Sequence, residues 1–393
     1  MKILRVIASV DPASGGPIAG LRAITPELRK LGHETEFLSV DDPQATFLNT
    51  VGAPVHAWGP TRTAYARSPA LRAWLAEHAQ EFDAVVIHGL WQDLGLAVRE
   101  CCTIAGVPYF VFPHGMLDPF LRRMYPVRHF KKWIYWLLSE RHVLRAARAV
   151  FFTCEEERRL AQKTFPLYSV NECVVKYGAA SPPNEFESSP GWLEKEIASP
   201  YWLFLGRIHS KKGLDLLLPA YAGFVSETVP QNRAAIPRLV IAGPCHSERY
   251  LSQLKGAANA LGIGGKIDWP GMLSGDAKWS TLAGAQAFVL PSYQENFGIA
   301  VAESLAVGTP VLVSDHVNIW REIVEDGAGF VEPANEAGTL QLFRRWSALS
   351  KGERETMQAA AQRCFQTRFQ IRAVAKDFAT ALSTLIRRPD SAG

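Results

Sequence analysis

The sequence predicts an α/β protein of two doubly wound, Rossmann-like domains, and three observations support this prediction. Short apolar runs rich in β-branched residues alternate with segments of helical length along the chain, a pattern typical of parallel sheets with helices on both faces. The 393 residues exceed the size of about 250 to 300 residues at which single hydrophobic cores stop growing. A tract rich in Pro, Ser and Glu interrupts the alternation at residues 181–199, and its prolines oppose regular structure.

The first domain is expected to span residues 1–180. Its strands are predicted where short apolar runs are separated by stretches of helical length. These runs are Ile3–Val10, Glu34–Val40, Ala84–His88, Pro108–Pro113 and Ala149–Thr153. Their alternation with helical stretches predicts one doubly wound sheet in this half of the chain.

The second domain is expected at residues 200–370, after a linker at 181–199. The same alternation restarts there, with predicted strands at Trp202–Leu205, Leu239–Ala242, Lys266–Trp269, Ala287–Leu290, Pro310–Val313 and Gly329–Val331. Open parallel sheets bind ligands outside the carboxyl ends of their strands. The two domains are therefore expected to face one another across a ligand-binding cleft.

A terminal helix is predicted in residues 371–393. Val374, Phe378, Leu382 and Leu385 recur there at helical spacing and share one face of the helix. One interpretation is that this apolar face packs back on the N-terminal domain.

The composition is that of an ordinary globular protein, with 48% hydrophobic and 20% charged residues. A formal net charge of +4 is too mild to indicate nucleic-acid binding. The segment Met1–Val10 is too short and too polar for a signal peptide or a membrane span, which predicts a cytoplasmic protein. The six cysteines show no CxxC pair and no metal-ligand spacing, so they are expected to be reduced thiols.

The segment Leu290–Thr309, LPSYQENFGIAVAESLAVGT, carries the sharpest chemical signal. A predicted strand ends before a loop with Glu295, and a helix that contains Glu303 begins near Gly298, so the two carboxylates can reach different parts of one elongated ligand. Asn296 and Gly298 leave backbone N–H groups at the helix start, where the helix dipole favours an anion by about 0.3 to 1 kcal/mol. The alternative is a solvated loop Glu and a surface helix Glu, the usual places for this residue.

A second signal is the segment Leu205–Gly213, LGRIHSKKG, in which Arg207 and Lys212 flank a strand-to-helix turn. Charge-assisted hydrogen bonds to phosphate contribute about 1.5 to 3 kcal/mol each. The two cations can therefore neutralise a diphosphate, and Lys211 is interpreted as a solvated neighbour. A solvated basic turn is the alternative for this segment taken alone.

The loop Ser14–Pro17, SGGP, follows the first predicted strand. Gly15 and Gly16 allow the backbone to approach a ligand closely. The loop is not a GxGxxG motif, which makes a dinucleotide site a weak interpretation. A plain strand-to-helix turn is the alternative.

His114 follows the predicted strand of FPHGMLD at its carboxyl end, and His88 has the same position in VIHGLWQD. A histidine at such a strand end can hydrogen-bond a sugar hydroxyl or a developing charge. A structural histidine bonded to a nearby carbonyl is an equally open alternative.

The segment Arg122–Arg148 interleaves many basic residues with aromatic residues over a helical length. Such a segment can lie on an anionic membrane surface as a peripheral contact. It can equally be a core-facing helix with a solvated basic side, and stacking on nucleic acid is a third, weaker interpretation.

No Asp-x-Asp pair occurs in the chain, and no His, Asp and Glu cluster has metal-ligand spacing. We therefore expect neither a metal ion nor another cofactor. Protein groups are then expected to neutralise the charge on a leaving phosphate.

Together these motifs resemble the retaining glycosyltransferases of family 4, which have the GT-B fold. The resemblance rests on GR-x4-KG at Gly206–Gly213, on E-x7-E at Glu295 and Glu303, and on ENFG followed by ESLAVGTP. The strings HGMLDP and VNIWREI resemble bacterial members that build exopolysaccharide or O-antigen repeat units. The likeness spans nearly the whole chain and is strongest in the second half.

The resemblance implies a nucleotide-sugar donor and a glycan or lipid-linked acceptor. Arg207 and Lys212 would hold the diphosphate of the donor, Glu303 its ribose hydroxyls and Glu295 its sugar. Retention would follow from front-face attack, in which the departing phosphate oxygen takes the acceptor proton. Catalysis is then mostly positioning and stabilisation of the leaving group.

The resemblance also implies which backbone faces the donor. The peptide groups near Phe297 and Gly298 would contact the donor, as would the loop with Gly15 and Gly16. His114 would lie beside the anomeric carbon.

Four other classes share parts of this pattern. A nucleotide-sugar epimerase of the same fold would convert the donor without an acceptor, and a non-catalytic subunit would bind the donor and transfer nothing. A phosphorylase would need a pyridoxal lysine site, for which the sequence gives no signal. An NAD-linked oxidoreductase is supported only by the SGGP loop.

Overall fold

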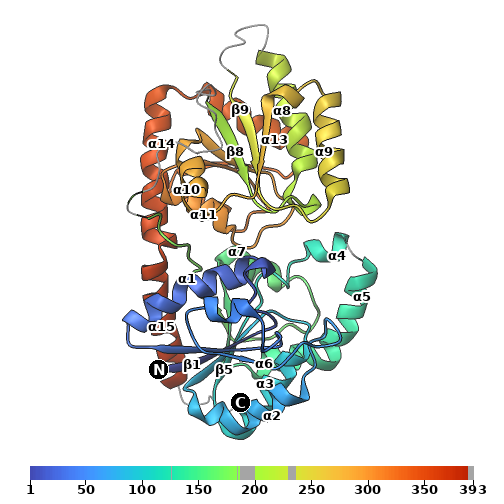
Figure 1. Ribbon diagram of the computed structural model, residues 1–393, viewed down its shortest axis with the longest axis vertical. Helices are drawn as coiled ribbons and strands as arrows, with labels where there is room; N and C mark the ends of the chain where they lie inside the picture. Colours follow the sequence, from blue (N-terminus) through green and yellow to red (C-terminus); the bar gives the residue numbers. More distant parts are fainter. Residues whose placement is uncertain (125, 184, 186–199, 229–235, 388–393) are drawn as a thin grey trace. The chain divides into compact units, whose positions relative to one another are not determined.

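The computed structural model describes residues 1–124, 126–183, 185, 200–228 and 236–387. The chain divides into two compact units, Met1–Gly178 with Ile371–Gly393, and Ala179–Gln370 (Figure 1). The predicted linker at 181–199 lies almost entirely outside the described residues.

The first unit contains a seven-stranded parallel sheet in the order β3-β2-β1-β4-β5-β6-β7. Its strands are β1 (Lys2–Ile7), β2 (Glu34–Ser39), β3 (Val55–Ala57), β4 (Ala84–His88), β5 (Tyr109–Phe112), β6 (Ala149–Phe152) and β7 (Glu172–Val174). The α helices of this unit are α1 (Gly16–Lys30), α2 (Pro69–His78), α3 (Asp93–Ala105), α4 (Phe120–Met124), α5 (Pro126–Tyr135), α6 (Arg141–Ala146), α7 (Glu155–Ala161) and α15 (Ile371–Arg387). The five predicted strands are confirmed, and the two edge strands, β3 and β7, were not predicted.

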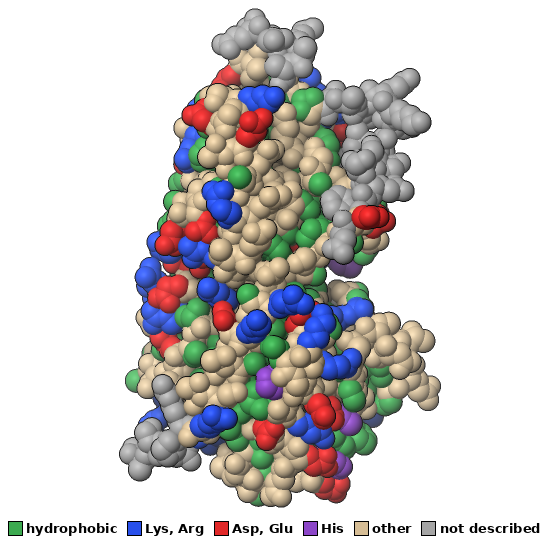
Figure 2. Space-filling view, turned by 90° about the vertical axis from the view of Figure 1, so that its left-hand side faces the viewer, with side chains coloured by type: hydrophobic (Ala, Val, Ile, Leu, Met, Phe, Trp, Pro, Cys, Tyr) green, Lys and Arg blue, Asp and Glu red, His purple; other side chains and the backbone are tan. Residues whose placement is uncertain are grey.

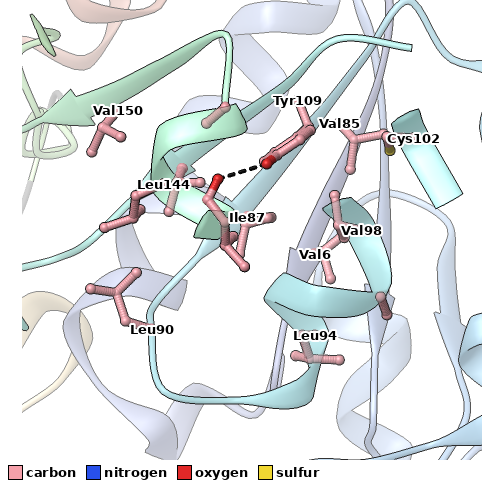
Figure 3. Packing of buried hydrophobic residues seen from close by; sticks show 14 of the residues in the cluster. Val6, Val85, Ile87, Leu90, Leu94, Val98, Cys102, Tyr109, Leu144 and Val150 are labelled. Atoms are coloured by element: carbon pink, nitrogen blue, oxygen red, sulfur yellow. Dashed lines mark hydrogen bonds between the residues drawn. The ribbon is translucent and has the colours of Figure 1, made fainter. Parts of the chain in front are cut away.

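One face of this sheet packs on α3 and α6 through a buried apolar cluster (Figure 3). Val85 and Ile87 of β4 lie in this cluster with Leu94 and Val98 of α3. The buried Tyr109 satisfies its hydroxyl by donating to the carbonyl oxygen of Val143, at 2.6 Å. The apolar residues of α3 and α6 therefore bury this face of the sheet.

The opposite face of the same sheet is covered by α1 and α15, which run side by side (Figure 1). Val374, Phe378, Leu382 and Leu385, the predicted apolar stripe of the terminal helix, are all buried against this unit. Helix α15 thus belongs to the first unit, although it follows the second in sequence.

The second unit contains a six-stranded parallel sheet in the order β10-β9-β8-β11-β12-β13. Its strands are β8 (Tyr201–Leu205), β9 (Arg238–Ala242), β10 (Ile267–Gly271), β11 (Ala287–Leu290), β12 (Val311–Ser314) and β13 (Gly329–Glu332). Its α helices are α8 (Leu214–Thr228), α9 (Glu248–Ala260), α10 (Gly275–Gly284), α11 (Ile299–Ala306), α12 (Trp320–Glu325), α13 (Glu336–Ala348) and α14 (Lys351–Cys364). All six predicted strands are present, with ends shifted by at most two residues.

The chain order reverses once in each sheet, between β1 and β4 and between β8 and β11. In doubly wound sheets, ligands bind at such a switch point, outside the carboxyl ends of the strands. The loops that follow these four strands are therefore the first places to look for a site in each unit.

The segment Arg122–Arg148 is not one helix. It is divided among the end of α4, α5, a π-helical stretch (Trp136–Glu140) and α6. Trp136 is fully buried, whereas Phe130 and Trp133 are exposed. The core-facing interpretation therefore applies to only part of the segment.

On the face of the chain that Figure 2 shows, Lys and Arg side chains are interspersed with Asp and Glu side chains. Within the described residues, no helix has both the length and the apolar character needed to cross a membrane.

Candidate functional site

The loops after β8 and β11 are locked together at the switch point of the second unit. Gly213 has a φ of +70°, and a Cβ there would overlap the carbonyl oxygen of Pro291. The carbonyl oxygen of Lys211 accepts hydrogen bonds from the Tyr293 N–H and the Ser292 hydroxyl, both at 2.9 Å. The two loops therefore touch backbone to backbone, which only a glycine at position 213 permits.

Lys212 and Glu295 form an ion pair within this contact. Each side chain is 18% exposed, so the pair lies at the surface of the site and not in the core. The Glu295 backbone is fixed by the loop after β12: its N–H donates to the carbonyl of His316 at 3.0 Å, and its carbonyl accepts from the N–H of Asn318 at 2.9 Å. The predicted cation and carboxylate thus meet directly.

Arg207 lies on the same loop, two residues after β8, and its side chain is exposed. It forms no ion pair with any of the described residues. Lys211, predicted to be solvated, is instead partly buried and donates to Gln294 Oε1 at 3.4 Å.

Helix α11 begins directly after the loop that carries Glu295. Gly298 precedes it with a φ of +75°, and no side chain caps the helix start. A Cβ at Gly298 would lie 3.0 Å from Val301 Cγ2 and 3.2 Å from Glu295 Cγ. The first N–H groups of a helix have no partner within the helix, and they favour an anion.

The side chains of the two residues before Gly298 are used within the protein. Phe297 is buried and packs edge-on against Phe369, with ring centroids 5.6 Å apart. Asn296 Oδ1 accepts a long hydrogen bond from Asn318 Nδ2, at 3.4 Å. At position 297, therefore, only the backbone is left to face a ligand.

Glu303 lies on α11 and forms an ion pair with Lys278 of α10, with Nζ and Oε1 2.7 Å apart. The Glu303 side chain is 12% exposed, so it is neither a free surface carboxylate nor fully buried. Lys278 was not predicted, because nothing in the local sequence of α10 distinguishes it. The neighbouring position of α10 and α11 brings it to Glu303.

In the first unit, the loop after β1 leads into α1 through Gly15, with a φ of +103°, and Gly16, the first residue of the helix. Asp41, which follows β2, accepts a hydrogen bond from the Val10 N–H at 2.8 Å. This carboxylate stabilises the loop after β1, so the role of Asp41 is structural.

His114 lies in a tight turn after β5, with a φ of +51°, followed by Gly115 with a φ of +74°. The buried Glu157 holds this turn: its Oε1 accepts from the Gly115 N–H at 2.6 Å, and its Oε2 accepts from the N–H and the hydroxyl of Thr153, both at 2.7 Å. A non-glycine residue with positive φ costs about 1 to 3 kcal/mol and persists only where its surroundings hold it, often at functional sites.

His114 also contacts His88, the last residue of β4. His88 Nδ1 and His114 Nε2 are 3.0 Å apart, and His88 Nε2 lies 3.1 Å from Nη1 of Arg5 in β1. Burial and, to a smaller extent, the charge of Arg5 lower the pKa of His114 to about 3. The pKa of His88 is also lowered, by burial and then by Arg5. Both imidazoles are therefore neutral at physiological pH.

The predicted site residues are divided between the two units. His114, Gly15 and Gly16 belong to the first unit, and the others to the second. Among the described residues, no group of three or more His, Cys, Asp or Glu side chains is arranged to hold a metal ion.

Comparison with known proteins matches both halves of the chain to family models. Residues 15–178 match the glycosyl transferase 4-like domain. Residues 192–363 match the glycosyl transferases group 1.

Two relatives are about one third identical to the chain over part of their length. An uncharacterized glycosyltransferase of Methanocaldococcus jannaschii is 32% identical over 190 residues, which are 45% of this chain and 46% of the relative. Mannosylfructose-phosphate synthase of Agrobacterium fabrum is 32% identical over 124 residues, 31% of this chain and 26% of the relative. The matches span less than half of the length of either relative.

A solved structure resembles the chain over nearly its whole length. Anabaena Alr3699/HepE, crystallised with UDP and glucose, superposes with a TM-score of 0.75 at 17% identity, covering 98% of this chain and 100% of that one. At this identity the likeness establishes the fold, which is the predicted GT-B arrangement of two Rossmann-like domains.

Proposed function

The chain belongs to the glycosyl transferases whose 4-like and group 1 models its two halves match, and from this we propose that it moves a hexose from a nucleotide-diphosphate sugar to an acceptor. We further propose that the transfer retains the anomeric configuration and needs no metal ion. The acceptor is a glycan or a lipid-linked glycan of a bacterial surface polysaccharide.

The observation that carries this proposal is the charged cluster at the β8–β11 switch point. Arg207 is exposed and unpaired among the described residues, and Lys212 is 18% exposed in its pair with Glu295. A diphosphate offers Lys212 stronger charge-assisted bonds than one carboxylate does. Binding of the diphosphate would then free Glu295 to accept hydrogen bonds from the hydroxyls of the donor sugar.

The second carboxylate, Glu303, accounts for the nucleoside part of the donor. Ribose hydroxyls are hydrogen-bond donors, and an ionised carboxylate is an acceptor only. Lys278 orients Glu303 through an ion pair of 2.7 Å without removing it from the surface. The uncapped start of α11 lies between the two carboxylates in sequence and offers N–H groups to the diphosphate.

The chemistry proposed for this site is stabilisation of the leaving diphosphate. Cleavage of the glycosidic bond places negative charge on the departing phosphate oxygen, and Arg207, Lys212 and the helix start neutralise that charge where it develops. The departing oxygen takes the proton of the acceptor hydroxyl, so no protein base is needed. Metal independence follows from this supply of positive charge.

We predict that the protein binds UDP in the presence of EDTA and that Glu303→Ala weakens this binding about ten- to a hundredfold. The loss corresponds to about 1.5 to 3 kcal/mol for hydrogen bonds to a charged group. Calorimetric titration with UDP, GDP and ADP measures it, and UDP is the first choice because HepE was solved with UDP and glucose. Glu336→Ala, at an exposed position of the same unit, is the control and should bind as the wild type does.

Incubation of the protein with the donor sugar separates the alternatives. A glycosyltransferase forms a new glycoside only when an acceptor is added, and the anomeric proton coupling of the product reports retention. Conversion of the donor sugar without acceptor would indicate the epimerase, and tight binding without any product would indicate the non-catalytic subunit. Binding that requires a divalent cation would contradict metal independence.

We also propose that α5 contacts an anionic membrane surface, where lipid-linked acceptors lie. Val127, Phe130 and Ile134 follow one another at helical spacing and are 74%, 63% and 44% exposed. Lys131 is exposed beside them. An exposed apolar stripe with adjacent cations is the pattern of a helix that lies in the membrane interface.

We predict that the double substitution F130S/I134S lowers binding to vesicles that contain anionic lipid about tenfold, because it removes apolar area that would enter the interface. Vesicle sedimentation measures this binding. Ile104→Ser is the matched control, since Ile104 on α3 is 88% exposed but lies outside the stripe. Equal binding of the double variant and the wild type, or equal binding to neutral and anionic vesicles, would contradict the proposal.

A further inference from the structure

Arg5 is a buried cation at the centre of the first unit. It lies in β1, its side chain is 1% exposed, and its guanidinium packs over the ring of Phe378, 4.8 Å from the centroid. Among the described residues no carboxylate pairs with it, and Nε and Nη2 have no hydrogen-bond partner. Its one hydrogen bond to a side chain goes to His88 Nε2, at 3.1 Å. A buried charge without a counter-ion is costly, so this arrangement calls for an explanation beyond stability.

The hydrogen-bond chain from Arg5 determines where the histidine protons lie. A guanidinium can only donate, so His88 Nε2 must be the bare, accepting nitrogen. The proton of neutral His88 is then on Nδ1, which donates to His114 Nε2 over 3.0 Å. His114 Nε2 is therefore also bare, and its own proton is on Nδ1.

The hydrogen bonds cannot run in the opposite direction. If His114 Nε2 donated to His88 Nδ1, His88 would carry no proton on either nitrogen and would be an imidazolate beside Arg5. A doubly protonated His88 is excluded as well, because its Nε2–H would point at an N–H of the Arg5 guanidinium. Only one proton arrangement satisfies both hydrogen bonds.

We infer that Arg5 and His88 are positioning residues that hold His114 as a neutral imidazole with its proton on Nδ1. This inference rests on the proposed function and on the role that the family resemblance implies for His114, beside the anomeric carbon of the donor. There the Nδ1–H donates to a hydroxyl oxygen of the donor sugar. Arg5 and His88 act only through His114.

A neutral donor suits the charge that develops in the proposed reaction. Departure of the phosphate leaves positive charge on the anomeric carbon and ring oxygen, and an imidazolium beside them would repel it. The groups packed around His114 do not favour its protonation: Arg5 of β1 is cationic, His88 of β4 is neutral, and the hydroxyl-bearing ring of Tyr177 meets His114 edge-on at 5.8 Å. The Arg5 charge therefore serves to keep both imidazoles neutral while it orders their protons.

Nitrogen-detected NMR on the intact protein labelled at its histidine ring nitrogens tests the inference without turnover. The result expected for the wild type is a His114 with protonated Nδ1 and bare Nε2, unchanged between about pH 5 and 8. A proton on Nε2, or an imidazolium that titrates within this range, would overturn the inference. Because the measurement needs no substrate, failure of the proposed transfer reaction would not be mistaken for failure of the hydrogen-bond chain.

Substitutions at Arg5 test its role in the hydrogen bonds that run from Arg5 through His88 to His114. Arg5→Met removes the donor to His88 Nε2, so the two histidines can reverse their hydrogen bond and the His114 proton is expected to move to Nε2. The value of kcat/KM should fall about tenfold, the effect of one hydrogen bond, mostly through kcat. Arg5→Lys keeps a cationic donor and should keep the proton on Nδ1. An unchanged His114 tautomer in Arg5→Met would remove Arg5 from this role.

A pair of substitutions at His88 covers the case in which Arg5→Met does not fold. His88→Asn can place an amide N–H₂ near the former Nδ1 and still donate to His114 Nε2, whereas His88→Phe keeps a ring against Phe112 but cannot donate. Only His88→Asn should retain the Nδ1–H form of His114 and most of the activity. Equal spectra and equal activities of these two variants would show that the ring, and not the hydrogen bond, matters.

Discussion

Lys212→Ala is expected to lower kcat/KM by about 10² to 10³, the largest effect of any single substitution in the donor site. The proposed transition state places negative charge on the departing phosphate oxygen. Loss of one preorganised cation in such a site costs about 2.7 to 4 kcal/mol. The substitution also leaves Glu295 without its ion-pair partner, and this carboxylate would then repel the diphosphate.

Steady-state kinetics and product binding distinguish the two contributions. If Lys212 acts on the leaving group, kcat falls by at least tenfold, beyond any weakening of UDP binding. The double variant K212A/E295Q removes the repulsion and should recover part of the donor affinity but little of kcat. Near wild-type kcat in Lys212→Ala would exclude Lys212 from leaving-group stabilisation.

Lys211→Ala is the matched control for this prediction. Lys211 is the adjacent lysine, and its side chain donates a long hydrogen bond to Gln294 Oε1, at 3.4 Å. The loop contacts of residue 211 run through its carbonyl oxygen, which the substitution retains. Its kcat/KM should stay within about threefold of the wild type, because the proposed contact with the phosphate is made by Lys212, and a partly exposed charge beside that contact contributes little.

Most of the fold could be predicted from the sequence, because the central strands of a parallel sheet are buried on both faces and appear as continuous apolar runs. Strands β3 and β7 were missed for the same physical reason. Each has three residues, lies at a sheet edge, and is largely half-buried or exposed, so neither presents an apolar run. Such strands are defined by pairing with a neighbour, which sequence periodicity does not record.

The residues of the candidate site also fall into those that could be predicted from the sequence and those that could not. Lys212, Glu295 and Glu303 lie in motifs at strand ends, where residue type and spacing carry the signal. Lys278 reaches Glu303 only through the packing of α10 against α11. The sequence around Lys278 contains no motif that indicates a site. Local motifs could be predicted, whereas partners supplied by packing could not.

Arg5 carries a signal that the sequence analysis did not use. It interrupts the apolar run of the first predicted strand, Ile3–Val10. A charged residue inside a central parallel strand has no solvent-facing side, so its side chain must be buried. That argument predicts a buried cation from sequence, and the partner of such a cation must come from a neighbouring strand, as His88 does.

Gly213→Ala is expected to destabilise the second unit by about 2 to 5 kcal/mol. A side chain at a φ of +70° costs about 1 to 2 kcal/mol. The new Cβ would overlap the Pro291 carbonyl, and forcing atoms into packed space costs a further 1 to 3 kcal/mol or so. The overlap is with backbone and not with a flexible side chain, so relief requires the β8 and β11 loops to move apart. That movement would also separate Lys212 from Glu295.

Native-state hydrogen exchange of the amides of β8 and β11 measures this loss in the second unit itself, which avoids assuming that a two-unit chain unfolds in one step. Gly256→Ala is the matched control. Gly256 lies in an exposed part of α9 with nothing within 4 Å of its Cβ position, so alanine should stabilise the same unit by up to about 1 kcal/mol. The same substitution thus has opposite signs at two glycines of one unit. Equal exchange in Gly213→Ala and the wild type would show that the two loops are not held together by this contact.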